Sequence, residues 1–123
     1  TIWNKNYYEE LKILENSYLK NNKPILLLVD KINSYDKSFK GDFNFTENSR
    51  VIRETSNQYI FTGAQIINRS IFERINKKVF SMNLVWDQMV KKKKLLGQES
   101  SQTFFHVNNF KVYEQLNKLK FID

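Results

Sequence analysis

Apolar residues recur every three or four positions in several parts of the chain, and this spacing is typical of amphipathic helices. Each of these parts begins at a Ser or Asn, whose side chain can cap the first turn of a helix. The first helix should end within residues 21–24, because the proline at position 24 disfavours helical geometry in the residue before it. We therefore predict helices that begin at Asn6, at Ser70 with Glu73 closing a capping box, at Ser81 and at residues 108–109.

Other segments have the patterns of strands. Residues 25–29 are apolar without alternation, which predicts a strand buried on both faces, as in a parallel α/β sheet. Residues 41–45 alternate and lead through a turn at 46–49 to a return strand at 50–53. Further strands are predicted at 59–67 and 103–107, and Gly97 is interpreted as the end of the Ser81 helical unit. The order of elements predicts a single α/β domain, residues 1–123, with a mixed central sheet.

The strand at 59–67 contains Gly63. A glycine inside a strand removes a side chain that could have packed, so it is expected where the backbone lies close to something else or bulges. The strand is followed directly by the predicted helix from Ser70. A strand that opens at a glycine and continues into a helix is a common way to build a ligand pocket at the edge of an α/β sheet. Gly63 is therefore a candidate site residue.

Composition excludes several classes of protein. The 123 residues suit one small domain or part of a larger one, and 41% hydrophobic residues are enough for a core. The absence of cysteine excludes disulfides and thiolate metal sites. No apolar run approaches the ~20 residues that cross a bilayer, and the first residues are too polar for a signal peptide. We therefore expect a cytoplasmic protein that does not enter a membrane.

The net charge is +7, and most of the positive charge comes from lysine. Proteins that read base edges usually favour arginine for its bidentate fork, so nucleic acid is not the expected partner. A lysine run at residues 91–94 also suits the C-terminal end of a helix, where the macrodipole favours cations. One alternative function stays open, that of a stand-alone basic α/β module that binds nucleic acid or a protein partner. Its phosphate-facing surface would consist of Lys37, Lys40, Lys77, Lys78 and residues 91–94.

The order and spacing of several short motifs resemble the C-terminal half of the sugar-1-phosphate nucleotidyltransferases. The similarity is greatest to the bacterial N-acetylmuramate-1-phosphate uridylyltransferases and the mannose-1-phosphate guanylyltransferases, and it covers nearly the whole chain. The matching segments are Thr1-Ile2-Trp3, Leu26-Leu27-Leu28-Val29, Gly41-Asp42-Phe43, Phe61-Thr62-Gly63-Ala64-Gln65-Ile66, Phe80-Ser81-Met82-Asn83, Trp86-Asp87 and Phe105-His106-Val107.

This resemblance implies a Rossmann-like α/β sandwich with a mixed sheet, of which the N-terminal half is missing here. In such enzymes an Asn-x-Asp turn supplies a magnesium-binding aspartate directly before a segment like Thr1-Ile2-Trp3. The glycine-rich nucleotide loop lies further upstream, and the three glycines of this chain cannot build one. The implied cofactor is Mg²⁺, and the implied partners are an NTP and a sugar 1-phosphate. The catalytic residues are expected ahead of Thr1, so this chain would supply the sugar-binding half and would be inactive alone.

Four residues are the predicted substrate-binding set: Gly41, Asp42, Thr62 and Gly63. Gly41 and Gly63 would let the backbone approach the sugar, and the Thr62 hydroxyl or backbone would donate to the ligand. Asp42 would accept hydrogen bonds from ring hydroxyls, since each carboxylate oxygen accepts more than one. The structural alternative is a Gly-Asp turn before the strand at residue 43 and a bulge at Gly63.

His106 is the only histidine. In the wider family this strand usually carries a metal-binding aspartate, where this chain has a histidine. Magnesium prefers oxygen ligands over imidazole. His106 is therefore a candidate for metal or phosphate contact, or a packed residue. Arg53 and Glu54 stand where relatives often carry a Glu-Lys pair in the opposite order, and Trp86 is expected in the core.

Overall fold

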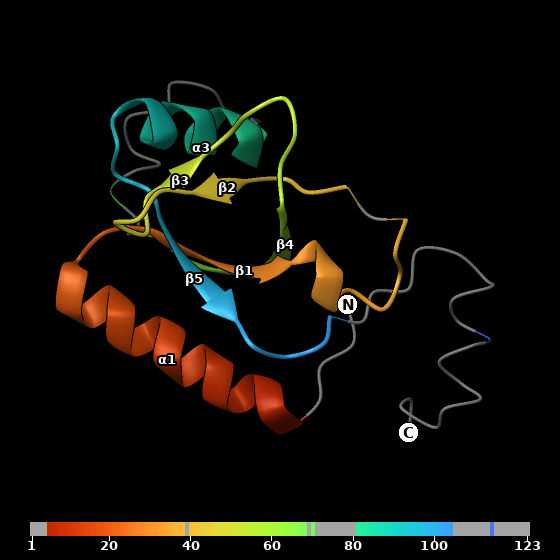
Figure 1. Ribbon diagram of the computed structural model, residues 1–123. Coiled ribbons are helices and arrows are strands. Elements are labelled where there is room, and N and C mark those ends of the chain that lie inside the picture. The colour runs from red at the N-terminus through yellow and green to blue at the C-terminus, as the bar shows by residue number, and fades with distance from the viewer. Residues whose placement is uncertain (1–4, 39, 69, 71–80, 105–113, 115–123) are drawn as a thin grey trace.

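The computed structural model describes residues 5–38, 40–68, 70, 81–104 and 114, and the side chains from residue 8 onward within these ranges. The described helices and strands confirm a mixed α/β fold (Figure 1). They are α1 (Lys5–Asn21), β1 (Ile25–Asp30), the 3-10 helix η1 (Lys31–Asn33), β2 (Asn44–Phe45), β3 (Val51–Ile52), β4 (Tyr59–Ile66), α3 (Met82–Lys91) and β5 (Leu96–Ser100).

Strand β1 is the centre of a three-stranded sheet with the order β4-β1-β5. It runs antiparallel to β4 and parallel to β5, so the sheet is mixed, as predicted. Residues 25–29 of β1 are all buried, with at most 2% of each exposed. The apolar run was predicted to form a strand buried on both faces of the sheet, and the structure confirms this.

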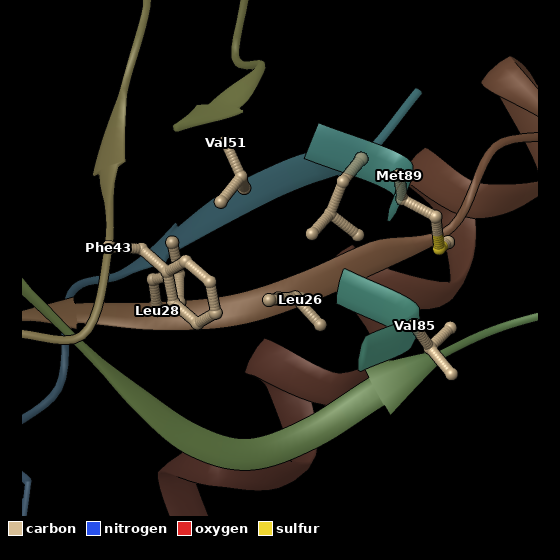
Figure 2. Packing of buried hydrophobic residues seen from close by; sticks show 7 residues of the cluster. Leu26, Leu28, Phe43, Val51, Val85 and Met89 are labelled. Carbon is tan, nitrogen blue, oxygen red and sulfur yellow. The ribbon is translucent and has the colours of Figure 1, made fainter. Parts of the chain in front are cut away.

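The two faces of the sheet are covered by different elements, as Figure 1 shows. Helix α1 lies on one face, where Leu14 packs against Ile25 and Leu27. The β2–β3 hairpin and α3 lie on the other face. The core there consists of Leu26, Leu28, Phe43, Val51, Val85, Met89 and Leu95, most of which Figure 2 labels.

The hairpin is fastened to both edges of the sheet. Next to β2, Phe43 pairs with Tyr59 of β4, and next to β3, Arg50 pairs with Leu96 of β5. The backbone N–H of Val51 donates to the carbonyl of Leu95 at 2.8 Å. These bonds occupy the first residues of both edge strands and hold the hairpin over the face of β1.

Strand β5 was not predicted, since Gly97 was interpreted as the end of a helical unit. Gly97 instead lies inside β5, where it pairs with Leu26. A Cβ atom on Gly97 would lie 2.2 Å from Cε1 of Phe45, so the glycine leaves room for that ring. The prediction was wrong because the reason for the glycine is a side chain more than fifty residues away.

The buried face of α1 is not purely apolar. Leu14 is buried, but Leu11 is 41% exposed and Glu10 is 4% exposed in its place. The Glu10 carboxylate is satisfied there, because it accepts hydrogen bonds from the hydroxyl of Ser101 at 2.8 Å and from its backbone N–H at 3.3 Å. A helical pattern based on hydrophobicity could not detect a buried carboxylate that has a partner 91 residues away.

The remaining predictions are confirmed in part, since β2 and β3 are shorter than the predicted strands at 41–45 and 50–53. Ser81 caps α3 by accepting from the N–H of Asn83 at 3.2 Å, as predicted. At the other predicted cap, the structure describes one bond, which the N–H of Ser70 donates to Asn68 Oδ1 at 2.9 Å. Phe104 pairs with Ser34 in an isolated bridge, while residues 105–107 of the expected strand lie outside the described residues. The same holds for the rest of the Ser70 helix and for most of the terminal helix.

We expect Gly97→Ala to lower the free energy of unfolding by about 1–3 kcal/mol, because the new methyl group collides with the Phe45 ring. Urea denaturation followed by circular dichroism measures the change. The double variant with Phe45→Leu should be less destabilised than the sum of the two single variants, since the smaller side chain leaves room. Additive effects would contradict ring contact as the reason for the glycine.

Candidate functional site at the carboxyl ends of β1 and β5

The carboxyl ends of β1 and β5 meet at one edge of the sheet because the two strands are parallel. Ligands of α/β proteins commonly bind outside this edge. Asp30 ends β1, Glu99 lies one residue before the end of β5, and Tyr59 begins the antiparallel β4 opposite Asp30. Three polar side chains from three strands therefore gather at this end, on the face that carries the hairpin.

Neighbouring groups fix the positions of these side chains. Asp30 Oδ1 accepts from Gln58 Nε2 at 2.6 Å and from the N–H of Ile32 at 3.1 Å. The Tyr59 ring packs on Phe45 with the ring centroids 4.4 Å apart. Across β1, the Tyr59 hydroxyl lies near enough to the carboxylate of Glu99 for that group to raise its pKa. The site is therefore held in place without any ligand.

The surroundings of Tyr59 keep its hydroxyl protonated. Burial is the largest cause of a raised pKa for Tyr59, followed by the hydrogen bond to Glu99 and by the negative charges of Glu99 and Asp30. One neutral hydroxyl thus shares this end of the sheet with two carboxylates. This combination suits the hydroxyl groups of a polyol, which donate and accept, better than it suits an anion.

The predicted Gly41 and Asp42 join the same region. A Cβ atom on Gly41 would lie 1.9 Å from the carbonyl oxygen of Asn57, so Gly41 permits a close backbone approach within the protein itself. The N–H of Asp42 donates to the carbonyl of Tyr59 at 2.7 Å, and Asp42 Oδ2 accepts from the N–H of Phe61 at 3.0 Å. The carboxylate therefore lies exposed on the outer edge of β4. Within the described part of the chain, its Oδ1 has no hydrogen-bond partner.

Thr62 is used inside the fold. Its side chain is 1% exposed, and its hydroxyl donates to the carbonyl of Leu27 at 2.8 Å and accepts from the N–H of Ala64 at 3.3 Å. The register of β1 and β4 shifts here, since Leu26 pairs with Gln65 but Leu28 pairs with Phe61. The hydroxyl satisfies a carbonyl where the ladder is interrupted, so its single proton is not free to bind a ligand in this arrangement.

Gly63 lies at the same register shift between β1 and β4, in agreement with the predicted alternative that it forms a bulge. Its φ of +97° is a conformation that side chains rarely adopt, and nothing lies within 4 Å of the position of a Cβ atom. Its backbone is exposed beside the strand edge that carries Asp42. Three of the four predicted substrate-binding residues, Gly41, Asp42 and Gly63, therefore have surface near the outer edge of β4. Their role in sugar binding stays a prediction.

Arg53 joins the hairpin to α3. Its guanidinium donates to Asp87 Oδ1 at 2.9 Å and to Asn83 Oδ1 at 2.7 Å, and its central carbon lies 4.5 Å from the ring centroid of Phe43. Trp86 packs against this core, as expected, and donates from Nε1 to Gln65 Oε1 at 3.0 Å. These contacts give Arg53 a structural role that its place beside Glu54 did not reveal.

The metal predictions reach beyond the described residues. His106 is outside them. Among the residues that the structure does describe, no three His, Cys, Asp or Glu side chains gather closely enough to hold a metal ion. We therefore assign no magnesium step to these residues. Within the same ranges, no helix is long and apolar enough to cross a membrane.

Comparison with known proteins adds no family to this description. No family model matches the sequence, and no curated protein is significantly similar to it.

Sequence reasoning missed Asp30, Tyr59 and Glu99 as site residues. A usable signal was present for Asp30, because a polar residue directly after a buried strand marks the carboxyl edge of a sheet. Glu99 could not be found without β5. Tyr59 was read only as the first residue of a strand, and its position opposite Asp30 depends on the register of the pair.

We expect Thr62→Val to lower the free energy of unfolding by about 1–3 kcal/mol, because valine keeps the shape but leaves the buried Leu27 carbonyl unpaired. The matched control is Thr55→Val at an exposed position, which should change stability by less than about 0.5 kcal/mol. Urea denaturation of both variants measures the difference. Equal stability of the two variants would contradict the role of the hydroxyl.

The raised pKa of Tyr59 predicts a loss of stability in alkali. The folded state holds this proton more tightly than the unfolded state, so the contribution is complete below the ordinary pKa of 10.0 and disappears as the pH rises through the folded value. Unfolding free energies measured between pH 8 and 11 should therefore fall less steeply for Tyr59→Phe than for the original protein. Tyr8→Phe, at a site that is 63% exposed, controls for the removal of one phenol. An unchanged slope in Tyr59→Phe would refute the prediction.

Proposed function

We propose that this chain is the sugar-phosphate-binding half of a sugar-1-phosphate nucleotidyltransferase with a Rossmann-like fold. The complete enzyme would transfer an NMP group from an NTP to a sugar 1-phosphate, giving an NDP-sugar and pyrophosphate. The observation that carries the proposal is the polar edge at the carboxyl ends of β1 and β5, where acceptors and one neutral donor suit sugar hydroxyls. Gly41 and Asp42, which the motif resemblance predicts as sugar-binding residues, lie near this edge and support the proposal.

The sugar would lie along the outer side of β4. The free Oδ1 of Asp42 would accept from a ring hydroxyl, while Oδ2 stays bonded to the N–H of Phe61. The exposed backbone of Gly63 leaves the surface beside it open, since no side chain projects there. The Tyr59 hydroxyl, together with Glu99 and Asp30, would supply further polar contacts at the end of the strand.

The chemistry of such a transfer needs alignment more than covalent help from the protein. An oxygen of the sugar phosphate attacks the α-phosphorus of the NTP, one P–O bond forms, and the bond to pyrophosphate breaks. The residues described above would bind and orient the sugar, so that its phosphate points to the nucleotide. Magnesium, which the resemblance implies, would neutralise phosphate charge when bound, with ligands other than the described residues.

Asp42→Ala should weaken the binding of a sugar 1-phosphate at least about tenfold, because a charged acceptor of sugar hydroxyls is lost. Isothermal titration of the full-length protein with N-acetylmuramate 1-phosphate and mannose 1-phosphate measures this. Nucleotide affinity should stay unchanged, since Asp42 is assigned to the sugar alone.

The matched control is Glu47→Gln, which removes an exposed negative charge in the hairpin turn. It should leave sugar-phosphate affinity as it was. Thermal unfolding of Asp42→Ala should accompany the titration, because the variant also loses the bond to Phe61. A folded Asp42→Ala protein that binds the sugar phosphate normally would remove Asp42 from the site.

A further inference from the structure

The opposite end of the sheet carries lysines instead of carboxylates. Because β1 and β5 are parallel, the segments that lead into them, residues 23–24 and 94–95, lie side by side. The N–H of Leu96 donates to the carbonyl of Pro24 at 2.9 Å and joins the two segments. Helix α3 also ends near this edge, because only residues 92–95 separate its last residue, Lys91, from the start of β5. This amino-terminal edge is distinct from the candidate site at Asp30 and Glu99.

A hollow of about 380 Å³ lies at this edge, between the end of α3 and the start of β1. Its apolar lining comes from Pro24, Val85 and Met89. Val85 and Met89 belong to the core of the sheet and project from α3 in Figure 2. The volume lies within the range of small-molecule sites, which combine an apolar surface with a few polar groups.

The charged groups that line the hollow are all cationic, beside four uncharged polar residues, Asn22, Asn68, Ser70 and Gln88. The cationic residues are Lys23, Lys92 and Lys94, and the lining includes no carboxylate. Among the described residues, the one ion pair joins Arg53 to Asp87, so these three ammonium groups have no acidic partner there. A second hollow of about 400 Å³ shares Lys23 and includes Arg50, again without a carboxylate. The positive charge is therefore concentrated around Lys23.

The competing electrostatic effect is the negative end of α3. A helix C-terminus is equivalent to about half a negative charge. Its last carbonyls are occupied, because the N–H of Lys94 donates to the carbonyl of Met89 at 2.9 Å and that of Lys93 to Val90 at 3.0 Å. Three full positive charges exceed this partial charge, so the hollow attracts anions.

Lys93 lies between Lys92 and Lys94 in the chain but does not line the hollow. Its φ is +59°, the left-handed conformation that helix C-termini usually assign to glycine. A lysine in this conformation costs about 1 kcal/mol relative to glycine. The run of lysines therefore includes a position at which glycine would make the helix end more stable.

From this arrangement we propose that the hollow binds a small phosphate monoester with an apolar or aromatic body. The phosphate lies against Lys23, Lys92 and Lys94, and the apolar body lies on Pro24 and on the edge of Met89 that reaches the hollow. The proposal is independent of the sugar-nucleotide function, because it uses none of the residues at the other edge. A hollow with an apolar floor favours a small molecule over a nucleic acid, whose backbone would follow an extended basic strip.

The test is isothermal titration of the purified protein with phenyl phosphate and with inorganic phosphate at low salt. Phenyl phosphate should bind at least about tenfold more tightly, because the apolar surface adds to the charged contacts. Lys92→Gln and Lys94→Gln should each weaken it about fivefold or more. The matched control is Lys91→Gln, which removes the same charge from the same run outside the lining and should leave affinity unchanged.

Three results would overturn the proposal. Equal affinities for phenyl phosphate and inorganic phosphate would exclude an apolar contact. Equal losses in Lys91→Gln, Lys92→Gln and Lys94→Gln would indicate a diffuse positive surface. A single-stranded oligonucleotide that binds tightly and loses affinity equally in all three variants would assign the lysines to a polyanion, as in the alternative function. Circular dichroism of each variant confirms that lost binding is not lost folding.

Discussion

The burial of β1 on both faces is the constraint on which the rest of this structure depends. Five consecutive apolar residues, 25–29, can only be removed from water if separate elements cover each side of the strand. Each fully buried Leu or Val side chain contributes about 1.5–3 kcal/mol relative to exposure, so leaving one face open would forfeit much of the stability of a small domain. Helix α1 covers one face, while the hairpin and α3 together cover the other.

The same strand separates two chemical environments. Its apolar middle excludes polar groups, so charges collect where the strand begins and ends. The carboxyl end presents Asp30 near Glu99 and a protonated Tyr59, whereas the amino end presents Lys23 near the lysines that follow α3. The parallel pairing of β1 with β5 brings the like charges of the two strands together at each end. The proposed sugar contacts and the proposed phosphate hollow follow from this separation.

The residues with the strongest motif signals are used largely by the fold itself. Gly41 makes room for the backbone at Asn57, Thr62 satisfies the Leu27 carbonyl, and Gly97 makes room for Phe45. Each of these roles is an adjustment for one close contact or one interrupted hydrogen bond. Asp42 differs, because one of its oxygens is bonded within the fold and the other has no hydrogen-bond partner among the described residues.

The sequence by itself determined the elements whose cause is local. The apolar run of β1, the helix α1, the capped helix α3, and the hairpin around residues 46–49 could all be predicted, because periodicity, caps and turns depend on neighbouring residues. So could the mixed α/β class.

Tertiary structure alone decided the features that depend on distant partners. Strand β5 has no alternating pattern, and its glycine is explained only by a ring from β2. The buried Glu10 depends on Ser101, and the grouping of Asp30, Tyr59 and Glu99 depends on strand order and register. Sequence patterns record what a residue needs from its neighbours along the chain, whereas these positions are set by contacts that form only when the sheet has assembled.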